Sequence, residues 1–193
     1  MLKHFNLSDQ LENDIMNIEF EDILNVDNDI IERVRNWRNT EEIKKYMIND
    51  HYIDKNEHNI WIKNLRNKNT MKAWLIKYEK KYIGLVYLLN INYEQKTTDW
   101  GFYIADKSER GKGIGSISLY KLIEYVFNEM KFNEMETIVL CNNTIIKLYK
   151  KFGFKIEKKL KNYLLKNNKY IDVFVMKLLR SNWKNLKSQL NCI

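Results

Sequence analysis

The sequence predicts an α+β fold in which a mixed, mostly antiparallel sheet of about seven strands is flanked by about four helices. Two observations support this prediction. The middle of the chain holds three strand-like segments in succession, which is the pattern of an antiparallel meander. A glycine-rich turn at residues 110–115 then leads into an amphipathic segment with helical spacing. An antiparallel meander that is followed by one helical crossover connection is an α+β arrangement.

The first third of the chain is predicted to hold one strand and then helices. Residues 15–23 alternate between apolar and polar side chains, as a strand does. Three helices are predicted to follow, each beginning at a residue type that caps helices. The candidate capping residues are Asp27 or Asn28, then Thr40, then Asp54 or Asn56. The polar residues 64–69 are predicted to form a loop.

The later strands are predicted from runs of β-branched and aromatic residues. They lie at residues 72–78, 82–91, 99–104, 137–141, 154–165 and 170–178. Between them we predict a long helix that ends near Lys131 and a short helix at residues 142–151. Gly101 lies inside a predicted strand, which indicates a bulge or a close approach to the backbone.

Length and composition indicate one domain of residues 1–180 and a tail of residues 181–193, which is expected to be helical. The 193 residues carry a formal net charge of +8, which favours anionic partners. The basic residues are spread along the chain and form no dense block, so a solvated surface is the favoured explanation. Cys141 and Cys192 have neither metal-ligand nor disulfide spacing, which favours a reducing cytoplasm. No signal peptide and no run of membrane-spanning length is visible.

The glycine-rich turn is the first candidate site, because it lies between a predicted strand and a predicted helix. Backbone N–H groups and the positive end of a helix bind phosphate at such turns. The spacing fits neither a Walker loop nor a dinucleotide-binding loop. It fits Arg-x-x-Gly-x-Gly at Arg110, Gly113 and Gly115. In this it resembles the pyrophosphate loop of the GCN5-related N-acetyltransferases. A turn that caps a helix without binding a ligand is the alternative.

A second motif follows about thirty residues later. Asn142, Tyr149, Gly153 and Phe154 match the pattern Asn-x-x-Ala-x-x-x-Tyr-x-x-x-Gly-Phe of the same family, whereas Ile145 stands where that family has alanine. Asn142 is a candidate helix cap or a contact to the pantetheine arm. Tyr149 would lie two helical turns further on the same face. The alternative for Tyr149 is an aromatic residue that only packs.

The resemblance covers about residues 15–180 and implies direct acetyl transfer to an amine, with acetyl-CoA as co-substrate and without a metal. Tyr149 would protonate the departing thiolate. Glu136 is the first candidate for the base that takes the proton of the amine, and Asp99 is the second. The implied cofactor-binding residues are Phe102, Tyr103, Ile104, Ala105, Arg110, Gly111, Lys112, Gly113, Ile114, Gly115, Asn142 and Tyr149.

The acceptor site is predicted from the early helices, where cationic and aromatic residues alternate. This region most resembles the sugar acetyltransferases of pseudaminic acid biosynthesis, which serve flagellin glycosylation in the cytoplasm. They acetylate the 4-amine of UDP-4-amino-4,6-dideoxy-N-acetyl-β-L-altrosamine, so the resemblance implies a UDP-amino-sugar as substrate. The implied substrate-binding residues are Arg38, Asn39, Met47, His58, Trp61 and Trp100.

Other interpretations stay open at this point. A protein N-terminal acetyltransferase of the ribosomal-protein type also carries Trp-Arg-Asn in its early helices and would have an open peptide groove. A non-catalytic module that binds acyl-CoA or nucleic acid would be expected to lack Tyr149 or the glycine turn, and both are present. We therefore expect neither nucleic acid nor a membrane as partner. Edge pairing of the last hairpin would allow a homodimer.

Overall fold

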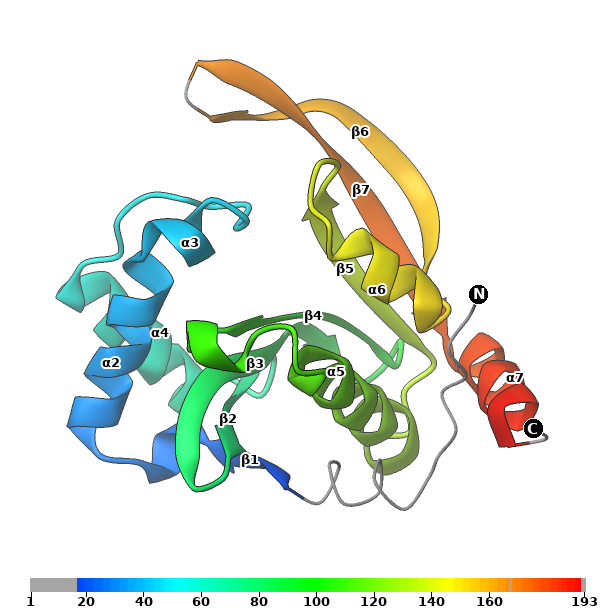
Figure 1. The fold of residues 1–193 in the computed structure, drawn as a ribbon, viewed down its shortest axis with the longest axis horizontal. Coiled ribbons are helices and arrows are strands. Elements are labelled where there is room, and N and C mark those ends of the chain that lie inside the picture. Colours follow the sequence, from blue (N-terminus) through cyan, green and yellow to red (C-terminus); the bar gives the residue numbers. More distant parts are fainter. Residues whose placement is uncertain (1–16, 167, 192–193) are drawn as a thin grey trace.

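The computed structural model describes residues 17–166 and 168–191, and it shows a curved sheet with helices on both faces (Figure 1). The strands are β1 (Ile18–Asp22), β2 (Lys72–Tyr78), β3 (Lys81–Asn92), β4 (Thr97–Ile104), β5 (Glu134–Leu140), β6 (Lys155–Lys166) and β7 (Lys169–Leu179). The α-helices are α2 (Asn28–Asn39), α3 (Glu41–Lys44), α4 (Lys55–Asn67), α5 (Ile114–Glu124), α6 (Ile146–Lys151) and α7 (Arg180–Asn191). None of the helices in the described segments has the length and hydropathy that a membrane crossing requires.

The sheet has seven strands in the order β1-β2-β3-β4-β5-β7-β6. Every neighbouring pair is antiparallel except β4 and β5, which are parallel and joined through α5. The predicted α+β fold with a mixed, mostly antiparallel sheet is therefore confirmed. Residues 15 and 16 of the first predicted strand lie outside the described residues.

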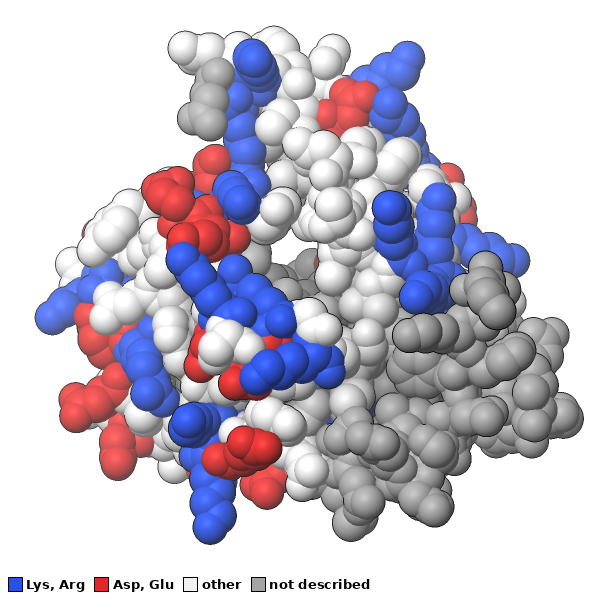
Figure 2. Space-filling model, viewed as in Figure 1, with Lys and Arg blue, Asp and Glu red and all other residues white. Residues whose placement is uncertain are grey.

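The two faces of the sheet bury two separate apolar clusters. Because successive side chains of a strand point to opposite faces, Val86 and Leu88 of β3 enter one cluster and Leu85 enters the other. The first cluster lies under α5, α6 and α7, and the second lies under α2, α3 and α4 (Figure 1). On the face shown in Figure 2, charged side chains of both signs are interspersed over the described residues, and this face is hollowed near the middle of the view.

Several predicted boundaries are wrong, each for a local reason. The predicted loop at residues 64–69 is helical as far as Asn67, because Leu65 is buried on the inner face of α4. The cap of this helix is Asp54, whose side chain accepts a hydrogen bond from the Glu57 N–H at 2.8 Å. Strand β5 begins three residues earlier than predicted, at Glu134.

Gly101 lies in regular register opposite Tyr87, so the predicted bulge is absent there. The irregularity of the β3–β4 pair lies instead between Leu89 and Asn92. The predicted close approach is present, because a Cβ atom on Gly101 would lie 2.4 Å from the Tyr87 hydroxyl oxygen. The absence of a side chain at Gly101 thus lets the Tyr87 ring lie across β4.

Helix α7 occupies the predicted tail, and it packs on the same face as α5 and α6. Trp183 is 2% exposed and belongs to the first core cluster. Its ring stacks on Phe152, with 6.0 Å between the ring centroids, and its Nε1 donates to Glu124 at 2.6 Å. The division of the chain at residue 180 stays a prediction, but the helix after it contributes to the core that supports α6.

The substitution Trp183→Ala should lower the free energy of unfolding by about 3–5 kcal/mol, because it leaves a large cavity and removes the hydrogen bond that Trp183 Nε1 donates to Glu124. Urea denaturation measures this change. The exposed neighbour Lys184 supplies the control, since Lys184→Ala should change stability by less than about 0.5 kcal/mol. Equal stability of the two variants would show that α7 is dispensable for the core.

Candidate active site

The site begins where β4 and β5 separate. The two strands pair only at three positions, Thr97 with Glu134, Thr98 with Met135 and Asp99 with Glu136. Just beyond, the hydroxyl of Thr137 donates to the Trp100 carbonyl at 3.1 Å. The strands then diverge (Figure 1), and a cavity of about 350 Å³ lies between β4, β5, α6 and the end of α3.

The backbone of β4 faces this cavity in a regular pattern. In a strand, the N–H and C=O of one residue point to one edge and those of the next residue point to the other edge. Because the Trp100 carbonyl points toward β5, the backbone groups of Phe102 and Ile104 also point toward the side from which β5 has moved away. Of these groups, the Ile104 carbonyl accepts a hydrogen bond from Arg110, and the others can pair with the amide groups of an extended ligand, as a neighbouring strand would.

The glycine turn lies at the end of β4 and leads into α5. Gly111 and Gly113 have positive φ angles of 81° and 88°, which glycine adopts without strain. A Cβ atom on either glycine would meet no atom within 4 Å, so the turn is open to a ligand. The N–H groups of residues 116 and 117 bond to the Gly113 carbonyl, which leaves the first N–H groups of the helix for an anion.

Arg110 was predicted to bind the pyrophosphate, but its guanidinium donates hydrogen bonds to backbone carbonyls of the protein. Its Nε donates to the Ile104 carbonyl at 2.9 Å, and its Nη2 donates to the Ala105 carbonyl at 3.2 Å. The guanidinium therefore fastens the glycine turn to the end of β4 while its side chain lines the cavity. It contributes positive charge beside the turn in addition to this structural contact.

Tyr149 projects from α6 into the cavity lining on the α5–α6 face of the sheet. The side chain is 6% exposed and packs edge-to-face on Trp100, with 5.0 Å between the ring centroids. Burial raises the pKa of the Tyr149 phenol, with a smaller contribution from the Tyr87 hydroxyl. Tyr149 is therefore a protonated group in the lining of this cavity, as a general acid must be.

The helix that carries Tyr149 begins later than predicted. Asn142 was predicted to cap it, but α6 starts at Ile146, and it is the Asn143 side chain that accepts a hydrogen bond from Ile145 N–H at 3.0 Å. Asn142 lies beside a separate groove near β7 and does not line the cavity.

A second cavity, of about 360 Å³, lies on the other face of the sheet, between α2, α4, β3 and β4. It brings together Arg38, His58 and Trp61, which were predicted together from the sequence. Tyr87 and Tyr103 line both cavities, so the two are neighbours across these two rings. Two ligands, one in each cavity, can therefore lie close together at these rings.

The second cavity contains polar atoms that no described residue satisfies. Arg38 Nη1 and the Tyr103 hydroxyl are buried without a hydrogen-bond partner among the residues that the structure describes. Burial lowers the pKa of Arg38 and raises the pKa of Tyr103, because loss of water disfavours the charged form of each side chain. Unsatisfied buried donors cost stability unless a ligand completes them.

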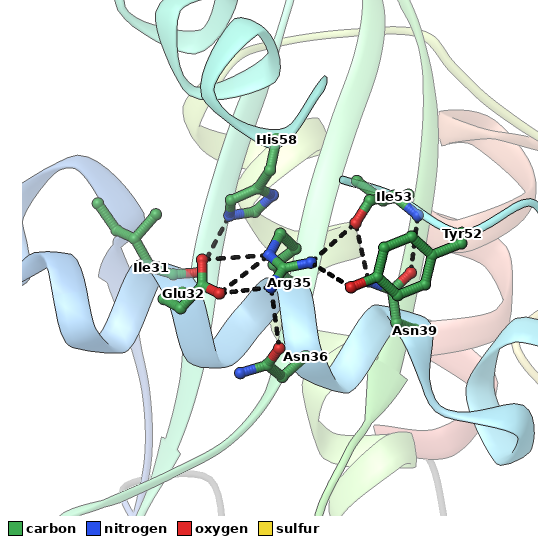
Figure 3. A network of polar contacts seen from close by, with 8 residues as sticks. All are labelled: Ile31, Glu32, Arg35, Asn36, Asn39, Tyr52, Ile53 and His58. Carbon is green, nitrogen blue, oxygen red and sulfur yellow. Dashed lines mark hydrogen bonds and ion pairs between the residues drawn. The ribbon is translucent and has the colours of Figure 1, made fainter. Parts of the chain in front are cut away.

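A hydrogen-bond network holds α2, α4 and the loop before α4 together beside the second cavity (Figure 3). Arg35 bonds to Glu32, to the Tyr52 hydroxyl at 3.0 Å and to the Ile53 carbonyl at 3.0 Å. Asn39 both donates to and accepts from the Ile53 backbone, at 2.9 and 2.8 Å. Asn39 therefore fastens a loop to α2, and it does not line either cavity.

His58 belongs to the same network through a bond between its Nε2 and the Ile31 carbonyl at 3.0 Å (Figure 3). The side chain is buried, and this burial lowers the pKa of His58. A neutral His58 that donates from Nε2 keeps Nδ1 as a hydrogen-bond acceptor. The tautomer thus follows from the backbone contact, and the ring lies against Trp61 with 5.3 Å between centroids.

The predicted base does not lie in the cavity lining. Glu136 forms an ion pair with Lys177 at 3.3 Å, and Lys177 also bonds to Glu134 at 2.8 Å. Asp99, the second candidate, accepts a hydrogen bond from Asn90 and is likewise absent from the lining. In the described part of the chain, no three His, Cys, Asp or Glu side chains are grouped as a metal site would require.

Most of the other predicted residues are brought together. The predicted residues that line the first cavity are Met47, Trp100, Phe102, Tyr103, Ile104, Arg110, Gly111, Gly115 and Tyr149. Those that do not are Ala105, Lys112, Gly113 and Ile114, and the Ile114 side chain is buried in the core. Tyr87 was missed, although an aromatic residue opposite a strand glycine is a signal that could have identified it.

Comparison with known proteins identifies the family. A family model described as an acetyltransferase (GNAT) domain matches residues 25–175. Acetyltransferase PseH of Campylobacter jejuni strain 81-176 is 31% identical over 127 residues, which are 65% of this chain and 77% of that protein. The putative ribosomal N-acetyltransferase YdaF of Bacillus subtilis is 27% identical over 128 residues, 66% of this chain and 69% of that one.

Solved structures agree on the fold. Spermidine N-acetyltransferase from Vibrio cholerae, in complex with CoA and spermine, has a TM-score of 0.80 at 22% identity. The match covers 88% of this chain and 99% of that chain. The chain belongs to the GNAT family, and it is an acetyl-CoA-dependent N-acetyltransferase.

Proposed function

We propose that the protein acetylates the 4-amine of a UDP-linked 4-amino-4,6-dideoxy-N-acetyl-hexose, UDP-4-amino-4,6-dideoxy-N-acetyl-β-L-altrosamine, in pseudaminic acid biosynthesis for flagellin glycosylation. The observation that carries this proposal is the pair of buried, unpartnered donors, Arg38 Nη1 and the Tyr103 hydroxyl, in the second cavity. A diphosphate or an N-acetyl carbonyl supplies the acceptor oxygens that these donors lack. The 31% identity to acetyltransferase PseH supports acetyl transfer, and the choice of acceptor rests on the motif resemblance and on these donors.

The first cavity supports a binding mode for acetyl-CoA. The glycine turn, with the start of α5 and the charge of Arg110, would hold the pyrophosphate. The backbone of Phe102 and Ile104 would pair with the pantetheine amides along β4. Lys112, Gly113 and Ile114 would contribute through the turn. Ala105 and Asn142 stay predicted contacts, which only a bound ligand can test.

In the proposed chemical step, Tyr149 is the general acid and Glu136 does not act as the base. The uncharged amine attacks the thioester carbonyl carbon, and the C–S bond then breaks with its electron pair moving to sulfur. Tyr149 gives its proton to that sulfur. Because Glu136 is paired with Lys177 outside the cavity lining, we assign the amine proton to water in the open channel.

Two rival acceptors follow from the relatives. The Vibrio cholerae spermidine acetyltransferases suggest a polyamine, but a polycation in the second cavity would meet the buried Arg38 charge. YdaF suggests the N-terminus of a ribosomal protein, the alternative that the sequence left open. A non-catalytic module that binds acyl-CoA or nucleic acid is disfavoured by the family and by the place of Tyr149.

The experiment that tests the proposal is acetyl-CoA-dependent thiol release with the purified protein. Parallel reactions would contain the UDP-amino-sugar, spermidine, or peptides with ribosomal-protein N-termini. Turnover on the sugar with a kcat/KM at least ~100-fold above the others supports the proposal. Turnover on peptides or spermidine alone would overturn the substrate and leave the acetyl-CoA site intact.

Location and assembly stay predictions. A cytoplasmic site is supported by the free Cys141 and by the nature of the substrates. A homodimer through the last hairpin is supported by the exposure of β6, an edge strand with few buried side chains.

Tyr149→Phe should lower kcat by about 10²–10⁴-fold and change the KM for acetyl-CoA little, because it removes a proton donor and keeps the packing on Trp100. Steady-state kinetics measure this change. Tyr93→Phe is the control, since Tyr93 is exposed and lies outside both cavities. Equal kcat values for the two variants would remove Tyr149 from the mechanism.

Arg38→Gln should raise the KM for the UDP-amino-sugar by about 10–100-fold, because a charge-assisted hydrogen bond to the acceptor is lost. The KM for acetyl-CoA should stay unchanged. Arg33→Gln is a matched control on the same helix, where Arg33 is exposed and stacks on Trp37. If Arg38→Gln instead improved turnover of spermidine and left the sugar unaffected, the acceptor would be a cation.

The pH dependence follows from the raised pKa of Tyr149. The phenol keeps its proton beyond the ordinary tyrosine value near ~10, so the acid stays available at alkaline pH. We expect kcat/KM to rise with pH as the acceptor ammonium loses its proton, and to show no fall below about pH 10. A descending limb that begins near ~8.5 would indicate an acid other than Tyr149.

A further inference from the structure

We propose that the Tyr87 hydroxyl donates a hydrogen bond to the acetyl carbonyl oxygen of acetyl-CoA and stabilises the oxyanion that forms there. This rests on the acetyl-CoA part of the proposed function and is independent of the identity of the acceptor. Tyr87 lies on β3, outside both motifs from which the cofactor site was predicted.

The position of the Tyr87 side chain follows from the register of the sheet. Tyr87 pairs with Gly101 across the antiparallel β3–β4 ladder, so both residues face the α2–α4 side. The atoms nearest to a Cβ on Gly101 would be the Tyr87 Oη at 2.4 Å, Cζ at 2.5 Å and Cε2 at 2.9 Å. The far end of the ring therefore lies across β4, where its hydroxyl reaches toward the open edge of that strand.

The Tyr87 hydroxyl is available to a ligand. It makes no hydrogen bond to any residue in the described segments, although Tyr87 lines both cavities. Burial raises the pKa of Tyr87, so the phenol is uncharged at neutral pH and acts as a donor rather than as a base. A donor without a protein partner at this place fits a ligand oxygen.

The channel directs the acetyl group to the same place. The glycine turn lies at the C-terminal end of β4, so a ligand whose pyrophosphate is held there runs along β4 toward the point of divergence. Trp100 marks that point, because its carbonyl bonds to Thr137 and its ring contacts Tyr149. Gly101 is the neighbour of Trp100 on the side of the glycine turn. A ligand that runs along β4 from the glycine turn therefore passes Gly101, and the Tyr87 hydroxyl that covers it, just before it reaches Trp100.

The two phenols then act from opposite faces of the sheet. As the amine nitrogen bonds to the carbonyl carbon, the C=O electron pair moves to oxygen, where the Tyr87 hydroxyl donates a hydrogen bond. As the carbonyl re-forms, the C–S bond breaks and sulfur takes the Tyr149 proton. Tyr87 keeps its proton throughout, so its contribution is electrostatic.

Tyr87→Phe should lower kcat by about 10²–10³-fold, the usual loss when one oxyanion donor is removed, with the KM for acetyl-CoA changed less than ~3-fold. Tyr93→Phe, at the end of the same region of the sheet, should be unchanged. Calorimetric binding of CoA and the melting temperature show whether each variant is folded. A kcat for Tyr87→Phe equal to that of Tyr93→Phe overturns the proposal.

Gly101→Ala tests the same contact without removing the hydroxyl. The new methyl group would force the Tyr87 ring away from β4, so kcat should fall as in Tyr87→Phe. The double variant should be no more than ~3-fold worse than Gly101→Ala, because both changes disrupt one interaction. Additive losses would assign Gly101 and Tyr87 to separate functions and overturn the proposal.

Infrared spectroscopy of bound acetyl-CoA with a ¹³C-labelled carbonyl needs no acceptor, so it separates this proposal from the sugar assignment. The hydrogen bond should shift the carbonyl stretch of the bound thioester to lower frequency, and the shift should be lost in Tyr87→Phe. An equal shift in both proteins overturns the proposal even if the UDP-amino-sugar is the acceptor. If the shift is lost in Tyr87→Phe but the enzyme turns over a different acceptor, the role of Tyr87 is supported and only the sugar assignment fails.

Discussion

The divergence of β4 from β5 is the constraint on which the rest of the structure depends. Two parallel strands that paired along their whole length would satisfy each other and leave no room for a ligand. Here the ladder stops after three pairs, and Thr137 closes it with a side-chain bond to Trp100. Beyond that point, the edge of β4 that faces away from β3 can pair with a ligand that behaves as a strand, as far as the Ile104 carbonyl, which bonds to Arg110.

Large aromatic residues stabilise this divergence. Trp100 lies where the strands part, and its ring contacts Tyr149 at 5.0 Å and Phe154 at 5.1 Å between centroids. Phe152, at the end of α6, stacks on Trp183 of α7. The space beneath the diverging strands is therefore filled from α6, and α6 is in turn held by α7. Tyr149, the proposed general acid, is thus part of the packing that keeps β4 and β5 apart.

Much of this could be predicted from the sequence, because it depends on local spacing. The glycine turn and Tyr149 lie in short motifs, and the strand–helix order around them follows from apolar periodicity. Asn39, Glu136 and Tyr87 depend on contacts between distant segments. Asn39 is occupied by Ile53, Glu136 by Lys177, and Tyr87 reaches the channel only through its register with Gly101. These contacts depend on the register of distant segments, so residue type alone predicts neither the partners of Asn39 and Glu136 nor the place of Tyr87.

The net charge of +8 is a poor guide to the acceptor, because cations near the channel mouth are neutralised locally. Lys112 bonds to Glu109 at 3.0 Å, and Lys107 bonds to Glu42 at 2.5 Å. Exposed pairs of this kind contribute little to recognition. Arg38 differs, since it forms no ion pair with any described residue and has one buried nitrogen without a partner. Burial of a cation without a counter-ion costs free energy, and a ligand group that is negatively charged or accepts a hydrogen bond offsets this cost. We therefore expect selectivity for the acceptor to depend on the incompletely satisfied guanidinium of Arg38 more than on the overall charge.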